Sequence, residues 1–504
     1  MRRPLLLAGL LVPALVLTAA LPTSGPASGL GLPTSNRQVP PGEDLANMRA
    51  AYGRIIGPGG QLRNPAYLPA LVLASSRTET DQLLQQAATP THPAVSPGNL
   101  APGWNVGNPL RAGWAGTRGR MRHVAFTNRY GALLRGTVYA PRRHARDPYT
   151  GRRLHGPYPG VVITPGSVQG SEGMYRWLAE DLAERGYVAL TFDVQGEGTS
   201  ETFPHTTGQA FPFCDPFGNP GPGEMTSCPG VPFQQLANFV VGTRDALRFF
   251  TSTPRHHYPD PRSAGARVDA FNPYWRLFDS SPDPRPFTPG RTTRIAIIGH
   301  SMGAAAVSKV QATDRRVATV VALDKLTGPH SPPPLDGSGN TPTVPALAVQ
   351  SEYGFTVTPA DMSGGSSLTP QPSDGVDPMR ERRTGFDAWH HARVDSMLVV
   401  PRASTHLEYT DVPLVLPASR WGQDLTSAYV QRWLDRYLKH GGGDRVLHER
   451  RFRYLEPVGH GVWRPVVLHR GALLSRRYCS AYSVRSARPG HRLRFDGDIA
   501  HVGC

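Results

Sequence analysis

The sequence predicts an α/β fold: a mainly parallel, eight-stranded sheet with helices on both faces and long loop insertions. Over about 320 residues, short apolar segments alternate with segments of helical periodicity, as in parallel strands joined by helical crossovers. Gly (54) and Pro (51) make up about a fifth of the 504 residues, above ordinary usage, which indicates long loops. Charged residues are only 18% of the chain, so a coiled coil or an all-helical bundle is not expected.

The expected strands begin with a hairpin and continue as short buried segments. Arg122–Thr127 and Leu133–Tyr139 flank the turn-forming residues 128–131, so they should pair in antiparallel fashion. The next six segments are short, apolar and β-branched, as strands buried on both faces are. They are Gly160–Thr164, Tyr187–Phe192, Arg294–Ile298, Val317–Leu323, Ala346–Gln350 and Ser396–Val400.

The expected helices show apolar residues at helical spacing. Met174–Arg185 is followed by Gly186, a residue that commonly ends a helix. The other expected helices are Asp44–Ile56, Thr78–Ala88, Phe233–Thr251, Met302–Gln311 and Asp424–Lys439. Long insertions interrupt the alternation, and loops of such length often form lids or binding loops. These insertions are Thr199–Pro232, Pro254–Thr293 and Thr356–Asp377.

The two ends of the chain differ from its middle. Arg2 and Arg3 precede an apolar run that ends in small residues, the order of a secretory signal peptide cleaved near Ala20. No later segment reaches ~18 consecutive apolar residues, so we expect a secreted protein without a stable membrane span. By composition and pattern the chain divides into a signal peptide at 1–20, a Pro- and Gly-rich extension at 21–118 expected to wrap the core, an α/β domain at 119–440 and an Arg-rich extension at 441–504.

The chain holds four cysteines, and an even number in an exported protein indicates disulfide bonds. Four cysteines allow three pairings. Proximity in the sequence favours Cys214 with Cys228 and Cys479 with Cys504. The absence of a Cys-x-x-Cys pair means that a thiolate metal site is not expected.

The formal net charge is +16, and nearly all of the basic residues are arginines. Residues 441–504 contain twelve arginines and five acidic residues, so this extension carries about half of the net positive charge of the mature chain. No nucleic-acid-binding motif accompanies this charge, so a nucleic acid partner is not expected. Two interpretations stay open: weak contact of this extension with an anionic cell envelope, or a solvated Arg-rich surface. The sequence gives no indication of the oligomeric state.

Residues Gly299–Gly303 read Gly-His-Ser-Met-Gly, a Gly-x-Ser-x-Gly pattern. The apolar segment Ile295–Ile298 precedes it as a strand, and Ala304–Val307 follows as the start of a helix. A strand–turn–helix of this kind exposes a serine hydroxyl above the sheet at the positive end of a helix. The pattern predicts Ser301 as a nucleophile.

A nucleophilic serine requires a base and an acid at the same edge of the sheet. His406 follows the last strand by six residues and is the expected base. Glu352, two residues past the seventh strand, is the expected acid. Asp324, at the end of the sixth strand, and Asp361 are the alternatives.

An acyl-transfer site also needs hydrogen-bond donors for an oxyanion. The backbone N–H of Met302, directly after the nucleophile, is one expected donor. The other is the N–H of Ser167 in the turn after the third strand, with Val168 as the alternative. No Gly-rich phosphate loop and no cluster of metal-spaced ligands is present in the sequence, so neither a cofactor nor a metal is expected.

The segment Asp193–Ser200, which reads Asp-x-x-Gly-x-Gly-x-Ser after a strand, resembles the corresponding turn of the α/β-hydrolase superfamily. The order Ser301, Glu352, His406 is that superfamily's order of nucleophile, acid and base. The similarity covers about Met121–His440, and the chain most resembles secreted bacterial esterases, lipases and dienelactone-hydrolase-like enzymes.

This resemblance implies a carboxylic ester hydrolase that forms an acyl-enzyme and acts on a small-molecule, lipid or polymer ester. The Pro165–Ser167 turn is similar to the oxyanion turn of bacterial polyester hydrolases. Two other readings stay open: a serine peptidase or amidase on the same fold, and a non-catalytic envelope-binding protein with a hydrolase fold.

Overall fold

In the computed structural model the chain separates into two compact units, residues 1–36 and 37–504. The structure describes residues 42–57, 60–96, 99, 103–167, 170–203, 235–259, 265–324, 326–329, 340–355, 357, 378–411, 420–441, 444–485 and 494–504, all in the second unit. Several sequence predictions lie outside the described residues: the signal peptide at 1–20, the Cys214–Cys228 bond, the alternative acid Asp361 and the alternative oxyanion donor Val168.

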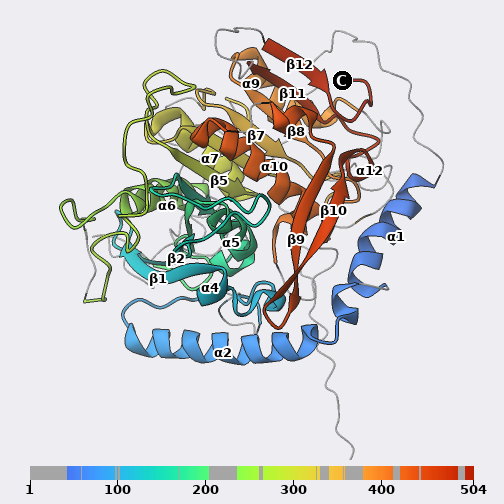
Figure 1. The fold of residues 1–504 in the computed structure, drawn as a ribbon. Coiled ribbons are helices and arrows are strands. Elements are labelled where there is room, and N and C mark those ends of the chain that lie inside the picture. The colour runs from blue at the N-terminus through green and yellow to red at the C-terminus, as the bar shows by residue number, and fades with distance from the viewer. Residues whose placement is uncertain are drawn as a thin grey trace, which may run out of the picture. The chain divides into compact units, whose positions relative to one another are not determined.

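The second unit is built on one sheet of ten strands in the order β1-β2-β4-β3-β5-β6-β7-β8-β11-β12 (Figure 1). Its strands are β1 (Gly119–Thr127), β2 (Leu133–Pro141), β3 (Gly160–Thr164), β4 (Val188–Phe192), β5 (Ile295–His300), β6 (Thr319–Leu323), β7 (Ala346–Val349), β8 (Ser396–Val399), β11 (Ala481–Arg485) and β12 (Arg494–Asp498). The strands from β4 across to β8 run parallel, and antiparallel pairs border them on both sides. The predicted α/β class is confirmed. The predicted sheet of eight mainly parallel strands is not, because the sheet is mixed and has ten.

The two additional strands come from the Arg-rich C-terminal extension. β11 pairs antiparallel with β8 at Tyr482 and Ser483, and β12 pairs with β11. A strand at the edge of a sheet leaves a row of N–H and C=O groups unpaired, and β11 supplies partners for that edge of β8. Cys479 and Cys504, which flank this hairpin, form the predicted disulfide, with their Cα atoms 5.6 Å apart. The extension therefore contributes to the central sheet.

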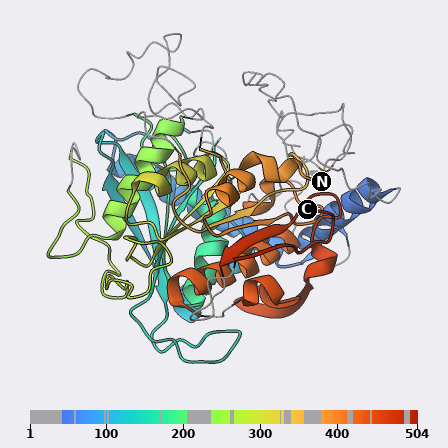
Figure 2. The ribbon, with the colours of Figure 1, turned by 90° about the horizontal axis from the view of Figure 1, so that it is seen from above.

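Helices cover both faces of the sheet (Figure 2). One face packs against α5 (Arg176–Glu184) and α10 (Arg420–Lys439), the other against α6 (Leu236–Phe250), α7 (Met302–Thr313) and α9 (Asp387–His391). Along β3, Val161 and Ile163 face the first set of helices and Val162 faces the second. This alternation is the reason that each central strand reads as an unbroken apolar run.

Shorter elements complete the described part of the chain. They are η1 (Gln61–Arg63), η2 (Pro109–Arg111), α4 (Trp114–Thr117), η3 (Glu172–Tyr175), η4 (Arg382–Phe386), η5 (His406–Tyr409), α11 (Arg445–His448), α12 (Arg470–Leu473) and the two-stranded sheet of β9 (Arg451–Gly459) with β10 (Val462–His469). None of the described helices combines the length and the apolar character needed to cross a membrane.

The N-terminal extension contains α1 (Glu43–Ile56) and α2 (Tyr67–Ala88). The apolar contact of α1 is made through Ala51, which packs with Tyr353, Val357 and Ala403. Tyr353 lies in the loop after β7 and Ala403 in the loop after β8. The first helix therefore lies against the two loops that bear Glu352 and His406.

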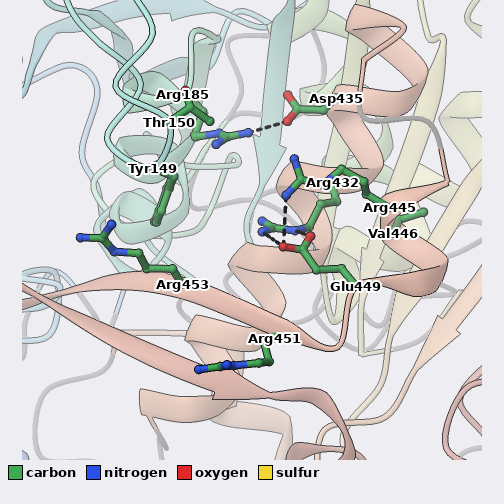
Figure 3. A pocket seen from close by; sticks show the side chains of 10 residues that line it. All are labelled: Tyr149, Thr150, Arg185, Arg432, Asp435, Arg445, Val446, Glu449, Arg451 and Arg453. Carbon is green, nitrogen blue, oxygen red and sulfur yellow. Dashed lines mark hydrogen bonds and ion pairs between the residues drawn. The ribbon is translucent and has the colours of Figure 1, made fainter.

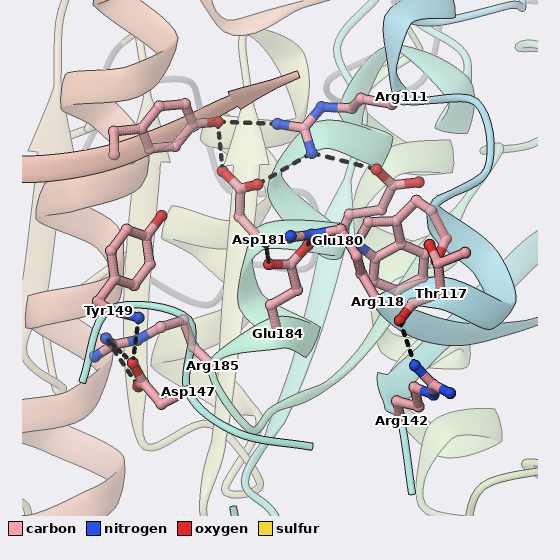
Figure 4. Close-up of polar contacts among 12 residues, drawn as sticks. Arg111, Thr117, Arg118, Arg142, Asp147, Tyr149, Glu180, Asp181, Glu184 and Arg185 are labelled. Atoms are coloured by element: carbon pink, nitrogen blue, oxygen red, sulfur yellow. Dashed lines mark hydrogen bonds and ion pairs between the residues drawn. The ribbon is translucent and has the colours of Figure 1, made fainter. Parts of the chain in front are cut away.

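Arg111, also from the N-terminal extension, joins α5 to β9 (Figure 4). Its guanidinium, 3% exposed, donates to Glu180 at 3.2 Å, to Asp181 at 3.1 Å and to the Tyr454 hydroxyl at 2.9 Å. A buried arginine of this kind is tolerated because charged partners replace its water. The contact fixes the β9–β10 hairpin against the helix layer.

Candidate active site

Ser301 stands at the sharp turn between β5 and α7. Its backbone has φ 54° and ψ −118°, a conformation that residues other than glycine rarely adopt. A Cβ on Gly299 would lie 2.1 Å from the carbonyl oxygen of Gly303, and a Cβ on Gly303 would lie 2.2 Å from that of Pro165. Only glycine fits at both positions, which explains the Gly-x-Ser-x-Gly pattern physically. The turn presents Ser301 at the carboxyl edge of the sheet and at the N-terminus of α7.

His406 lies in η5, in the loop that follows β8, and is 5% exposed. Its Nδ1 pairs with Oδ2 of Asp324, the residue directly after β6. Because β5, β6 and β8 are parallel strands of one sheet, the residues that follow them lie at the same edge. When Asp324 is ionised, Nδ1 of His406 carries the proton and Nε2 is left as a proton acceptor.

Asp324 is itself held rigidly. Its backbone has φ 54°, and the residue is 2% exposed. The second carboxylate oxygen, Oδ1, accepts hydrogen bonds from the Ser351 N–H at 3.1 Å and the Ser351 hydroxyl at 2.9 Å. Donors of this kind stabilise the ionised form of a carboxyl group and fix its orientation. Ser351 therefore aims Oδ2 of Asp324 at the imidazole.

Glu352, the acid expected from the sequence, has a different environment. It is fully buried, and Oε2 accepts from the Ala403 N–H at 2.6 Å and from the Asn47 amide at 3.1 Å. Oε1 accepts from the Ser475 hydroxyl at 2.7 Å. Burial raises the pKa of Glu352, and the Ala403 N–H and the Ser475 hydroxyl oppose that rise. The assignment of Glu352 as the partner of His406 is corrected: the structure brings Asp324 to that position.

The direction of successive side chains explains the difference. Ser351 and Glu352 are neighbours just after β7, and their side chains have different partners. The Ser351 side chain bonds to Asp324, whereas that of Glu352 bonds to α1 and the C-terminal extension. Spacing along the sequence placed both carboxylates at the correct edge but did not fix which one faces His406.

His300, which precedes Ser301, was not among the predicted site residues, and the structure places it at the centre of a hydrogen-bond chain. The Gly166 N–H donates to the Tyr175 hydroxyl at 2.9 Å, and that hydroxyl lies 2.8 Å from Nδ1 of His300. Nε2 of His300 lies 2.9 Å from the carbonyl oxygen of His406. Because a carbonyl only accepts, Nε2 carries the proton and the Tyr175 hydroxyl donates to Nδ1.

This chain links the turn after β3 to the loop that carries His406. Burial, with a smaller contribution from neighbouring His406, lowers the pKa of His300 to about 3, so the ring is neutral near neutral pH. Both ring nitrogens of His300 are already engaged in hydrogen bonds. His300 therefore holds the two loops in place and is not itself free to act as the base.

The residues expected to supply the oxyanion donors belong to two segments close to Ser301. Met302 is the first residue of α7, so its N–H has no acceptor within the helix. A Cβ on Gly166 would lie 3.1 Å from that of Ser301, so the turn holding Ser167 approaches Ser301 closely. The Ser167 hydroxyl donates to Glu197 at 2.7 Å, which ties this turn to the Asp-x-x-Gly-x-Gly-x-Ser segment. The segments that bear these two N–H groups thus both adjoin Ser301.

Comparisons with known proteins found the following similarities. No family model matches the chain. A curated, uncharacterized protein of Pseudomonas aeruginosa is 31% identical over 115 residues, which are 22% of this chain and 29% of that protein. Among solved structures, a ferulic acid esterase from Streptomyces cinnamoneus aligns with a TM-score of 0.37 and 19% identity, over 64% of this chain and 90% of that one.

Proposed function

We propose that this protein is a serine hydrolase that cleaves carboxylic esters, with Ser301 as nucleophile, His406 as base and Asp324 as acid. One observation carries the proposal: the buried pair of Asp324 and His406 lies at the sheet edge where the strained turn presents Ser301. Nucleophile, base and orienting carboxylate are recognised by such geometry rather than by sequence position. The mixed α/β sheet is compatible with the α/β-hydrolase resemblance of the sequence.

The mechanism follows from the roles of these groups. His406 Nε2 takes the hydroxyl proton as Ser301 Oγ bonds to the ester carbonyl carbon, and the carbonyl electron pair moves to oxygen. The N–H groups of Met302 and Ser167 stabilise the resulting oxyanion. The oxyanion then re-forms the carbonyl, the C–O bond to the alcohol breaks, and His406 protonates the departing alkoxide. Water, deprotonated by His406, releases the acid from the acyl-enzyme by the same steps.

Export is part of the proposal. The Cys479–Cys504 disulfide supports an oxidising compartment, since such bonds are rare in the cytosol. The expected signal peptide at 1–20 would direct the chain there.

Ester and amide substrates distinguish this function from a peptidase or amidase. We expect turnover of p-nitrophenyl esters from acetate to long-chain acids and little turnover of aminoacyl p-nitroanilides, because an amine is a poorer leaving group than a phenolate. The chain length with the highest kcat/KM identifies the acyl class. Hydrolysis of the anilides alone would contradict the ester assignment, and turnover of neither class would favour a non-catalytic binding protein.

Glu352 acts in this proposal as a positioning residue. Its carboxylate ties together α1 through Asn47, the His406 loop through Ala403 and the C-terminal extension through Ser475. Arg402, in the same loop, donates to Asn47 Oδ1 at 2.8 Å. The two extensions thus fasten the loop that carries the base.

We expect Asn47→Ala to lower kcat for a short ester by about tenfold, because small displacements of catalytic groups are costly. KM should change little, since Asn47 has no role in binding the substrate. Asn64→Ala is the matched control: Asn64 lies in the same extension and donates to the Val458 carbonyl at 3.1 Å, away from the His406 loop. Equal losses in the two variants would show a general effect of destabilisation and would contradict the positioning role.

A further inference from the structure

A pocket of about 200 Å³ lies at the edge of the sheet opposite to Ser301 (Figure 3). One of its lining residues, Arg185, lies three residues before the start of β4, whereas Ser301 directly follows the end of β5. Both strands run parallel to β3, so these two positions are at opposite edges of the sheet. The pocket is therefore separate from the candidate active site, and its function is independent of ester hydrolysis.

Positive charge dominates the walls of this pocket. Five arginines line it, contributed by the end of α5, by α10, by α11 and by β9, against two carboxylates, those of Asp435 and Glu449. Tyr149 and Thr150 close one side. A concave site with walls of one charge concentrates its field and attracts small ions of the opposite charge.

Both carboxylates are already engaged with arginines of the pocket. Glu449 accepts from Arg432 at 2.6 and 3.0 Å and from Arg445 at 3.2 Å. Asp435 accepts from Arg185 at 2.6 Å. Figure 3 shows these contacts, and Figure 4 shows Arg185 beside Asp147, whose carboxylate lies 2.9 Å away. The two carboxylates thus pair with three of the arginines, and the other two have no carboxylate partner in the pocket.

The two unmatched arginines are Arg451 and Arg453, on β9. Side chains alternate along a strand, and those of Phe452 and Tyr454 point into the core. Arg451 and Arg453 therefore share the exposed face of β9. Among the described residues, neither guanidinium has an ion-pair or hydrogen-bond partner. Two arginines two residues apart on one strand face can approach a single ligand together.

We propose that this pocket binds a phosphate group of a multiply charged anion, with Arg451 and Arg453 as the principal ligands. The planar guanidinium matches phosphate oxygens with paired hydrogen bonds and remains charged at all physiological pH values. The volume is below the ~300–1,000 Å³ of pockets for drug-sized ligands, so a headgroup-sized anion suits it. The basic C-terminal extension thereby contains a defined anion site in place of a diffuse surface charge.

Titration with inorganic pyrophosphate at constant ionic strength tests the proposal. We expect measurable binding by the full chain and about tenfold or greater weakening in the double variant Arg451→Gln/Arg453→Gln, because charged hydrogen bonds to the anion are lost. The matched control is Arg248→Gln/Arg315→Gln. It removes two exposed arginines near α6 and α7, on the other face of the sheet, and it should bind as the wild type does.

Absence of binding by the wild type, or an equal loss in the control variant, would overturn the proposal. Thermal unfolding of each variant without ligand verifies that folding is retained, since the replaced side chains are exposed. Vesicles containing phosphatidylglycerol identify the source of the phosphate. Vesicle binding that requires Arg451 and Arg453 and is displaced by pyrophosphate assigns a lipid headgroup. Pyrophosphate binding without vesicle binding assigns a soluble or polymeric phosphate.

Discussion

Replacing Asp324 by Asn is expected to lower kcat for a short ester by about 10⁴-fold without unfolding the protein. The Ser351 N–H and hydroxyl both donate to Oδ1 of Asp324, so in the variant they hold the amide oxygen at that position. The amide nitrogen then faces His406 Nδ1 and donates to it. This forces the imidazole proton onto Nε2, and a protonated Nε2 cannot accept the proton of Ser301.

Glu352→Gln is the control for this prediction. Glu352 is also a buried carboxylate at the same edge of the sheet, but its partners are Ala403, Asn47 and Ser475. The same change of charge there should lower kcat by about tenfold, because it displaces the loop that carries His406. It should not change which ring nitrogen of His406 carries the proton. Steady-state kinetics of the two variants decide between the carboxylates. A large loss in Glu352→Gln with little effect in Asp324→Asn would restore the assignment made from spacing.

Replacing Ser301 by Ala is expected to lower kcat by about 10⁶-fold, since removal of the nucleophile of a triad costs as much as removal of the whole triad. The fold should persist. Alanine, like serine, has a Cβ, so the backbone at φ 54° is no more strained in the variant. Ester turnover and the Tm of thermal unfolding are the measurements. An unchanged turnover would exclude Ser301 as the nucleophile, and a large fall in Tm would leave loss of folding as the cause.

Much of the fold could be predicted because the central strands are short and buried on both faces. Gly160–Thr164 and Ile295–Ile298 consist almost wholly of apolar or β-branched residues, which only a two-sided core favours. The strands of the C-terminal extension could not be found in this way. In β12, Arg494–Asp498, apolar and charged residues mix, and its hairpin depends on pairing with β8, far away in the sequence.

Prediction of the candidate site was most specific where one local segment determines the geometry. Ser301 is marked by two glycines that only a tight turn requires, and His406 follows the last parallel strand. Which carboxylate faces His406 could not be chosen from spacing, because a carboxylate follows both β6 and β7 and the choice depends on the side on which each side chain points. His300 and Asn47 act through Tyr175, the His406 carbonyl and Glu352, which distant segments supply.

The central claim, that Ser301 is a nucleophile activated by His406, is tested most directly by covalent trapping with a fluorophosphonate followed by mass spectrometry of the digested protein. The predicted result is a single phosphonyl adduct on Ser301, formed rapidly in the wild type, slowly in Asp324→Asn and not at all in Ser301→Ala. An intact, folded wild type that forms no adduct, or an adduct that persists unchanged in Ser301→Ala, would contradict the account.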